Sequence, residues 1–233
     1  MARRTFMQKF ARWHIWLGWL IGVPLLLWTL SGLVMVVRPI EEVRGTSLRL
    51  EHQPAPVRVQ LGNGSGDTLI REGQILDQRG RSVLIATFMD GSVHRIDLGA
   101  PGQTLLPPVD AAEARAAVRH AVKGGDKVAA IRLFPADQSP PDFRKTMAAW
   151  QVTLTDGTHV YVGRDTGEIE AIRTDWWRFY DFMWGLHIMD LETREDTHHP
   201  LLIGFAGLAL ASCLLGTVLL FRRRRAAKRS MAN

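Results

Sequence analysis

Two long stretches without a charged side chain dominate this sequence. Between Arg12 and Arg38 there are 25 residues with no Asp, Glu, Lys or Arg, and residues 201–221 form a second stretch of this kind. As helices they would reach roughly 37 Å and 31 Å, and about 30 Å of hydrocarbon has to be crossed. The sequence therefore predicts two transmembrane helices, at 13–37 and 200–221.

The charged residues are distributed in three blocks. The formal charge of +6 would suggest a nucleic-acid-binding protein, but residues 1–37 and 222–233 hold ten basic residues and no acidic one. The middle of the chain, 38–199, then holds 19 basic and 23 acidic residues, a net charge of −4. This distribution excludes a basic nucleic-acid-binding domain, so no nucleic-acid partner is expected. Basic flanks stay in the cytoplasm, which places both termini inside and 38–199 on the far side of the membrane.

A cleaved signal is the alternative interpretation of the first stretch. A signal peptide has an apolar region of about 7–15 residues and a small-residue cleavage site. This stretch is longer and ends in VMVVRPIEE, without a pair of small residues. Arg3-Arg4 also resembles part of a twin-arginine export signal. We favour a permanent membrane anchor.

The segment 107–174 has the pattern of one helix followed by antiparallel strands. Asp110 is a suitable N-cap for the helix, and Gly124-Gly125 ends it. Asp156-Gly157 stands between two alternating stretches, which is a strong hairpin signal. The expected strands are 128–134, 149–155, 159–162 and 168–173.

The sequence around the second hairpin has a counterpart earlier in the chain. Val83 to Phe88, Asp90-Gly91-Ser92 and Val93 to Leu98 echo the hairpin centred on Asp156-Gly157. One interpretation is a degenerate repeat of the same half-unit. The other is that two ordinary β-hairpins look alike.

Several motifs resemble those of one membrane protein family. Residues 150–169, WQVTLTDGTHVYVGRDTGEI, resemble the last strands of a PepSY domain. The first span, with R-W-H-x-W-L-G-W-x-x-G, is similar to the opening helix of PepSY-associated transmembrane proteins, and W-G-L-H-I-M-D before the second span fits the same family. The resemblance implies an α+β membrane protein of the bacterial inner membrane. Two transmembrane helices would flank an extracytoplasmic PepSY-like domain, a helix plus an antiparallel sheet.

The expected organisation follows from these patterns. Its parts are a basic cytoplasmic N-terminus (1–12), the first transmembrane helix (13–37), a β-rich half (38–106), a PepSY-like domain (107–174), an interfacial aromatic helix with a linker (175–199), the second transmembrane helix (200–221) and a basic cytoplasmic tail (222–233).

His14 lies at the start of the first span, on a helical stripe with small residues. Spacings of three and four place it in line with Gly18 and Gly22, a G-x-x-x-G pattern that lets another helix approach closely. A histidine beside glycines suits an axial ligand of haem b. The alternative is an interfacial histidine within the aromatic belt formed with Trp13, Trp16 and Trp19.

A second group of histidines precedes the second span. His187 lies in the aromatic segment DWWRFYDFMWGLHIMD, and His198 and His199 follow with Asp196. Three interpretations stay open: a polar cap on a helix at the membrane surface, haem ligation, or a transition-metal site made from imidazoles and a carboxylate.

The separation of these histidines shapes the functional hypothesis. Roughly 30 Å of membrane separates His14 from His187, so one haem in one chain cannot use both. A homodimer packed through Gly18 and Gly22 would pair each histidine with its mate, or His187 with His198 or His199, and carry electrons outward. Larger members of the family, with more spans, are implicated in reducing ferric siderophores, and others are known only as iron-regulated inner-membrane proteins. The resemblance therefore implies a haem-dependent reductase or electron conduit for iron uptake.

The competing hypothesis is a non-catalytic, membrane-anchored sensor or binding module for a peptide, a partner protein or a metal ion. The sequence has no H-E-x-x-H, G-x-S-x-G or Walker motif. It therefore assigns no catalytic residue.

Overall fold

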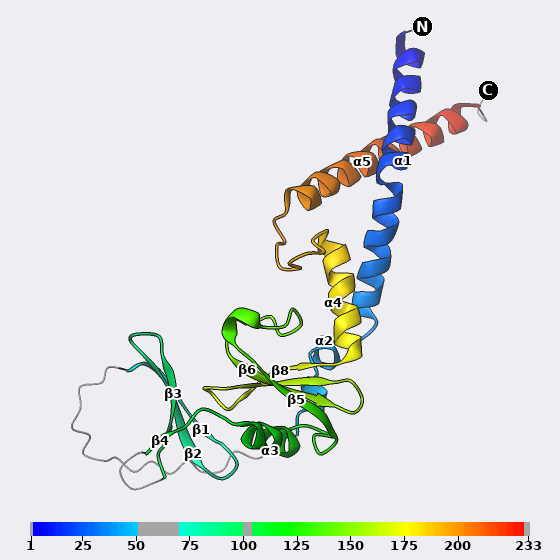
Figure 1. Ribbon diagram of the computed structural model, residues 1–233. Coiled ribbons are helices and arrows are strands. Elements are labelled where there is room, and N and C mark those ends of the chain that lie inside the picture. Colours follow the sequence, from blue (N-terminus) through cyan, green and yellow to red (C-terminus); the bar gives the residue numbers. More distant parts are fainter. Residues whose placement is uncertain (1, 51–69, 100–103, 231–233) are drawn as a thin grey trace. The chain divides into compact units, whose positions relative to one another are not determined.

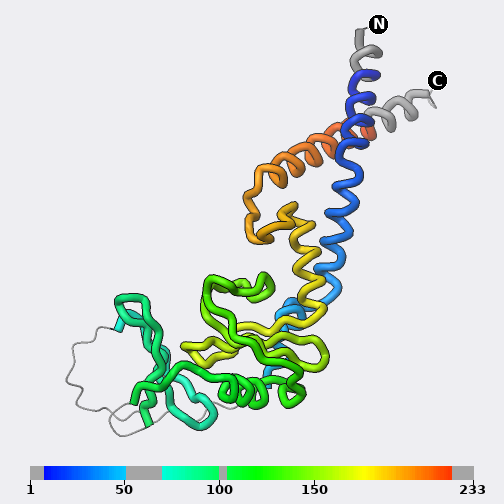
Figure 2. Tube along the Cα trace, viewed as in Figure 1, coloured from blue at the N-terminus to red at the C-terminus, as the bar shows by residue number. Residues whose placement is uncertain are grey.

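The chain folds into two compact units. The computed structural model describes residues 2–50, 70–99 and 104–230, with side chains for 8–50, 70–99 and 104–221. We call Met1–Arg38 together with Phe179–Asn233 the helical unit, and Pro39–Arg178 the sheet unit. Figures 1 and 2 show both units along the chain.

The helical unit contains the two expected spans. They are α1 (Ala2–Val36) and α5 (Pro200–Ser230), of which Gln8–Val36 and Pro200–Phe221 are long and apolar enough to cross a membrane. Most of α4 (Asp175–Ile188) belongs to the same unit. The first residues of α1 and the last residues of α5 lie at the same end of this unit (Figure 1), as two spans require when both termini are on one side.

The larger part of the sheet unit is a helix followed by a four-stranded antiparallel sheet. The elements are α3 (Ala111–Ala121), β5 (Val128–Phe134), β6 (Ala149–Leu154), β7 (His159–Gly163) and β8 (Ile169–Arg173), with the strands in chain order. The Asp110 carboxylate accepts the N–H of Glu113 at 2.7 Å, which confirms the predicted N-cap. Gly157 has a φ of +82°, a conformation that glycine adopts easily, and this confirms the predicted hairpin.

Both faces of this sheet are covered. On one face α3 packs Val118 against a cluster of buried strand residues, which includes Val152, Val160, Val162 and Ile172. On the other face the segment 135–148, which contains the short helix η2 (Ala136–Gln138), lays Phe143 on the ring of Tyr161 with centroids 4.4 Å apart. Burial and a hydrogen bond to Asp142 raise the pKa of Tyr161 well above its ordinary value.

The first part of the sheet unit contains a second antiparallel sheet. Its strands are β1 (Ile70–Asp77), β2 (Ser82–Phe88), β3 (Val93–Asp97) and β4 (Thr104–Leu106), again in chain order. Gly91, with a φ of +85°, turns β2 into β3 as Gly157 turns β6 into β7. A shared origin of the two sheets stays a prediction. The short helices α2 (Ile40–Val43) and η1 (Thr46–Leu48) precede this sheet, and residues 51–69 of the expected β-rich half lie outside the described residues.

A buried guanidinium joins this second sheet to α3. Arg95 on β3 is only 3 % exposed, and it donates to both carboxylate oxygens of Glu113 on α3, at 2.7 and 3.0 Å. Arg79, from the β1–β2 turn, donates to the same carboxylate at 2.8 Å. Hydrogen bonds and charge from Arg95, assisted by Arg79, hold the pKa of Glu113 below its ordinary value. A Cβ on Gly167 would lie 2.8 Å from Arg95 Nη1, so only glycine leaves room for this contact.

Arg95→Met should destabilise the sheet unit by about 3 kcal/mol, because it leaves a carboxylate without one partner of a buried pair. The measurement is urea unfolding of the purified protein in detergent. Arg81→Met, which removes the mostly exposed partner of Asp97, is the control and should cost less than about 1 kcal/mol. Equal effects of the two substitutions would contradict the role of Arg95.

Candidate functional site

His187 lies in the last turn of α4 with its ring against α1. Its Nδ1 is 3.1 Å from the Ser31 hydroxyl and 3.2 Å from the carbonyl oxygen of Trp28. The imidazole stacks on the ring of Trp28, with centroids 4.7 Å apart and planes inclined by 19°. A Cβ on Gly32 would lie 3.1 Å from Cε1, so this glycine allows the ring to approach α1. The C-terminal end of α1 therefore forms a closely packed, partly polar contact surface for His187.

The end of α4 fixes the place of His187. Met189 has a φ of +58°, its N–H donates to the Leu186 carbonyl at 3.3 Å, and the N–H of Asp190 donates to the Gly185 carbonyl at 3.0 Å. These two bonds form a Schellman motif, in which glycine usually holds the left-handed position. The methionine found here costs about 1 kcal/mol. His187 thus occupies the last regular turn before a sharply defined helix end.

The carboxylate of Asp190 accepts several hydrogen bonds from the linker that follows α4. The groups that donate to Asp190 are the Thr193 hydroxyl and the backbone N–H groups of Glu192, Thr193, Glu195 and Asp196. These bonds, led by the one from the Thr193 hydroxyl, hold the pKa of Asp190 well below its ordinary value. Arg194 pairs with Asp181 on α4 at 2.5 Å. The linker is therefore folded back on the helix that carries His187.

His14 has similar surroundings at the other end of α1, where α5 crosses it. Its Nδ1 is 3.5 Å from the Ser212 hydroxyl on α5. A Cβ on Gly216 would lie 3.0 Å from Cε1 and 3.3 Å from Nε2. Each histidine thus has a serine beside Nδ1 and a glycine against its ring, both on a neighbouring helix. The difference is that Nε2 of His14, and not only Cε1, lies close to the space that a Cβ on the glycine would fill.

The two imidazoles lie far apart along α1. Ser31, which contacts His187, follows His14 by 17 positions, and this corresponds to roughly 26 Å along a helix. One haem within one chain cannot bind both.

His198, His199 and Asp196 lie in the linker just before α5. The Asp196 carboxylate accepts the N–H of His198 at 2.8 Å, and Nδ1 of His199 accepts the N–H of Leu201 at 3.3 Å. Among the described side chains of residues 8–50, 70–99 and 104–221, no group of three or more His, Cys, Asp or Glu is arranged to hold a metal ion. The interpretation of His187, His198, His199 and Asp196 as metal ligands stays a prediction.

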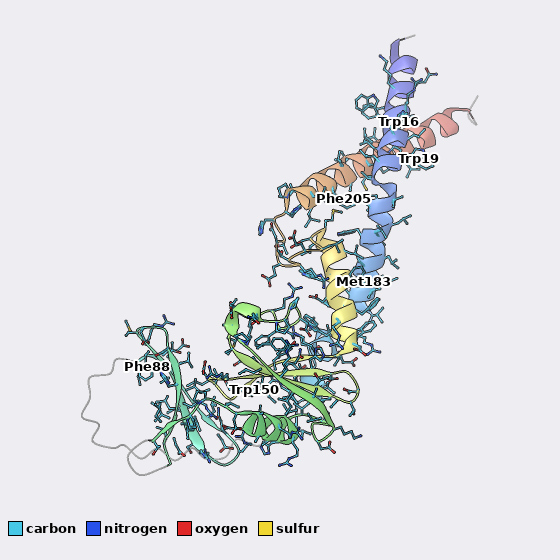
Figure 3. The ribbon with its side chains drawn as sticks, viewed as in Figure 1. Trp16, Trp19, Phe88, Trp150, Met183 and Phe205 are labelled. Carbon is cyan, nitrogen blue, oxygen red and sulfur yellow. The ribbon has the colours of Figure 1, made fainter. Side chains whose placement is uncertain are left out.

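Gly18 and Gly22 lie open on α1. A Cβ at either position would meet nothing within 4 Å, so α5 does not pack on them. They line an apolar groove of about 660 Å³, here called the α1 groove, with Ile15, Trp19, Val23, Leu25, Leu26 and Thr29. Trp16 and Trp19 lie on the N-terminal half of α1 (Figure 3), and Trp19 is 81 % exposed. Their exposure fits contact with lipid or with another protein rather than with α5.

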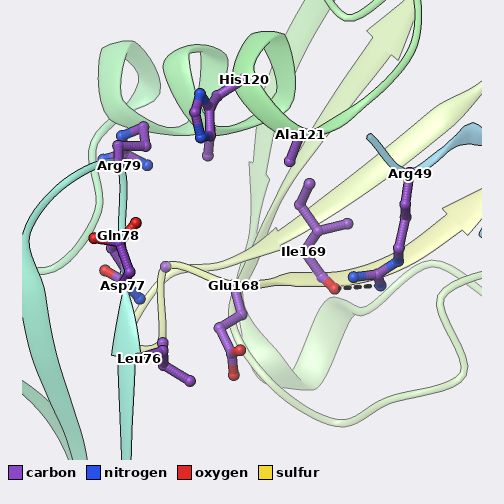
Figure 4. Close-up of a pocket in the computed structure, with 11 residues that line it drawn as sticks. Arg49, Leu76, Asp77, Gln78, Arg79, His120, Ala121, Glu168 and Ile169 are labelled. Atoms are coloured by element: carbon purple, nitrogen blue, oxygen red, sulfur yellow. Dashed lines mark hydrogen bonds between the residues drawn. The ribbon is translucent and has the colours of Figure 1, made fainter. Parts of the chain in front are cut away.

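The sheet unit has a small polar pocket that the sequence did not indicate. A hollow of about 260 Å³ lies between the β1–β2 turn, α3 and the start of β8 (Figure 4). Its ionisable lining residues are Arg49, Asp77, Arg79, His120 and Glu168. Arg49 donates to the carbonyl of Ile169 at 2.8 Å. Burial, together with repulsion from Glu170, raises the pKa of Glu168, and Arg49 and Lys145 oppose this shift. A half-buried carboxylate in a concave site is a common property of binding sites.

The two spans and the sheet unit define the class of this protein. It is a two-span membrane protein with an extramembranous α+β domain. A family model, the PepSY-associated TM region, matches residues 11–232. The chain therefore belongs to this family, and the suggested resemblance is confirmed. No curated protein and no solved structure matches the chain significantly.

Sequence reasoning missed the partners of both histidines. Ser31, Gly32, Ser212 and Gly216 come from helices that are distant in sequence from the histidine each one contacts. Small residues that interrupt an apolar span are the signal that was present, because they mark close helix contacts.

Glu168→Gln should stabilise the protein at neutral pH by at most about 1 kcal/mol, because the group is partly exposed. The folded protein binds this carboxyl proton more tightly than the unfolded chain, so stability falls as pH rises above the ordinary pKa of 4.5. Melting temperatures measured between pH 4 and pH 7 should show the gain at pH 7 and none at about pH 4. Glu72→Gln on exposed β1 is the control. A gain that persists at low pH would contradict this account.

Proposed function

We propose that this protein is a bacterial inner-membrane electron conduit that binds haem b through His187 and His14 and serves the reduction of ferric siderophores or another step of iron uptake. The observation that carries the proposal is the paired arrangement in the helical unit. At each end of α1 an imidazole is held with a serine at Nδ1 and a glycine against its ring. Ionisable side chains within membrane spans usually mark function.

His187 meets the requirements of an axial ligand. Histidines that bind metals usually have Nδ1 held by a carbonyl or another polar group, so that Nε2 can bind. Here Nδ1 lies beside the Trp28 carbonyl and the Ser31 hydroxyl, and no hydrogen-bond partner of Nε2 is seen in the described part of the chain. A bound haem would supply a one-electron redox centre. The protein holds the imidazole in place.

His14 meets these requirements in part. Gly216 gives its ring room and Ser212 lies at Nδ1, but Nε2 also lies close to Gly216, 3.3 Å from where a Cβ there would be. Ligation by His14 therefore requires free space at Nε2 beside Gly216.

A homodimer supplies the second ligand that each haem needs. The α1 groove is lined by Gly18 and Gly22 and is left open by α5, so a second copy of α1 can pack there. His187 of the second copy, or His198 or His199, would then complete the outer site. The basic ends favour a cytoplasmic location for both termini, which directs electrons outward to the side of the sheet unit.

A membrane-anchored binding module is the second candidate. The pocket beside Glu168 favours it, because an ionisable, concave site in the sheet unit suits a small polar ligand. In that case the helices would only anchor the domain.

Absorbance distinguishes the two candidates. The protein purified in detergent after expression with haem available should show a Soret band, with about one haem per chain if two haems serve a dimer. His187→Ala and His14→Ala should each lower the haem content to about half, since each removes the ligands of one site.

His94→Ala, which changes a histidine of the sheet unit whose ring makes an edge-on contact with Phe88, is the matched control and should keep the full haem content. A colourless wild-type protein that takes up no haem would exclude the conduit and favour the binding module.

Gly18→Leu should convert the proposed dimer into monomers, because the leucine fills the α1 groove. Light scattering coupled to size-exclusion chromatography measures the mass. Gly204→Leu is the control, since a side chain at that position on α5 also meets open space. A dimer that survives Gly18→Leu but not Gly204→Leu would place the seam on the other helix.

A further inference from the structure

The hydrogen bonds around His187 determine which of its ring nitrogens carries the proton. Two oxygen atoms lie next to Nδ1, the hydroxyl of Ser31 at 3.1 Å and the carbonyl of Trp28 at 3.2 Å. Ser31 is 1 % exposed, so water does not compete for its hydroxyl. The tautomer of the ring therefore depends on whether these two oxygens act as donors or as acceptors.

Both oxygens present lone pairs to the imidazole. The Ser31 hydroxyl donates its one hydrogen to the Trp28 carbonyl, at 2.9 Å. A hydroxyl has no second hydrogen to give, so while its hydrogen lies on Trp28 it is an acceptor toward His187. The Trp28 carbonyl is an acceptor by its chemistry. A bare Nδ1 would face a lone pair of the Trp28 carbonyl and could bond only by drawing the Ser31 hydrogen away from Trp28, whereas an N–H at this position keeps the bond from Ser31 to Trp28 and has two acceptors beside it.

A flipped ring does not satisfy the same contacts. Rotating the imidazole by half a turn places Cδ2 beside Ser31 and Trp28 and leaves both oxygens without this donor. The stacking on Trp28 and the close approach to Gly32 keep the ring plane against α1. The orientation with Nδ1 toward α1 is thus the one that uses the available acceptors.

We infer that Ser31 is a positioning residue that holds neutral His187 in the Nδ1–H tautomer, with Nε2 as the bare electron-pair donor facing away from Ser31. Free neutral histidine in water prefers the tautomer with the proton on Nε2, so the contacts with α1 reverse this intrinsic preference. An N–H donated to an acceptor also makes the opposite nitrogen a stronger base. The tautomer stands on the geometry alone, and only the identity of the metal centre that would use it rests on the proposed function.

The test is NMR of ¹⁵N-histidine in the full-length protein, in detergent and without haem, at about pH 9, where imidazoles are neutral. The His187 signals, assigned by their loss in His187→Gln, should show protonated Nδ1 and bare Nε2. Ser31→Ala removes one acceptor and should lower the preference for this tautomer by about two- to tenfold, the worth of one hydrogen bond.

Two variants make the result specific. Ser31→Thr keeps a hydroxyl that can bond the preceding turn, and it should restore the wild-type tautomer. Thr29→Ala removes a neighbouring hydroxyl that donates to the Leu25 carbonyl, and it should change nothing. A His187 that carries its proton on Nε2 in the wild type, or a tautomer ratio unchanged in Ser31→Ala, would overturn the inference.

The same variants separate this inference from the haem proposal. If haem binds, Ser31→Ala should raise the reduction potential of the His187 site, because the ligand becomes a weaker donor. If no haem binds, the NMR result still decides the tautomer. A colourless protein with the expected tautomer would overturn only the haem proposal.

Discussion

Polar side chains in a membrane helix have no water to bond to, and the helical unit depends on this constraint. The hydroxyls of Ser31 on α1 and Ser212 on α5 have hydrogen-bond partners within the protein and lie beside the two histidines. Because unpaired polar groups are costly in hydrocarbon, these contacts restrict how the three helices can pack. The histidines are therefore parts of the helix contacts as well as candidate ligands.

The sheet unit also contains a buried polar group, here a charged one, that needs partners within the protein. Arg95 is buried beside α3 and the β7–β8 turn, and its guanidinium has to find acceptors outside its own strand. Glu113 and the Pro107 carbonyl supply them, and Gly167 leaves the space. A buried charge of this kind has to keep these acceptors, because removing one partner leaves the other charge uncompensated.

Local patterns predicted the elements of this fold well. The uncharged stretches, the Asp110 cap and the Asp156-Gly157 turn each report an interaction within a few residues, and the structure confirms them. The long-range contacts were not predictable in this way. Neither hydrophobic periodicity nor a cap indicates that His187 meets Ser31, 156 positions earlier in the chain. The end of α4 also uses Met189 where a sequence rule expects glycine.

Gly32 and Gly216, the glycines next to the two imidazoles, are sites at which substitution by alanine affects a histidine. Alanine in place of glycine is normally a mild and even favourable change inside a helix. At Gly32 and Gly216 the added methyl group would press on a histidine ring rather than on solvent or lipid. The smallest possible enlargement of the chain at either site would thus require a histidine ring, which we propose as a haem ligand, to shift by a few tenths of an ångström.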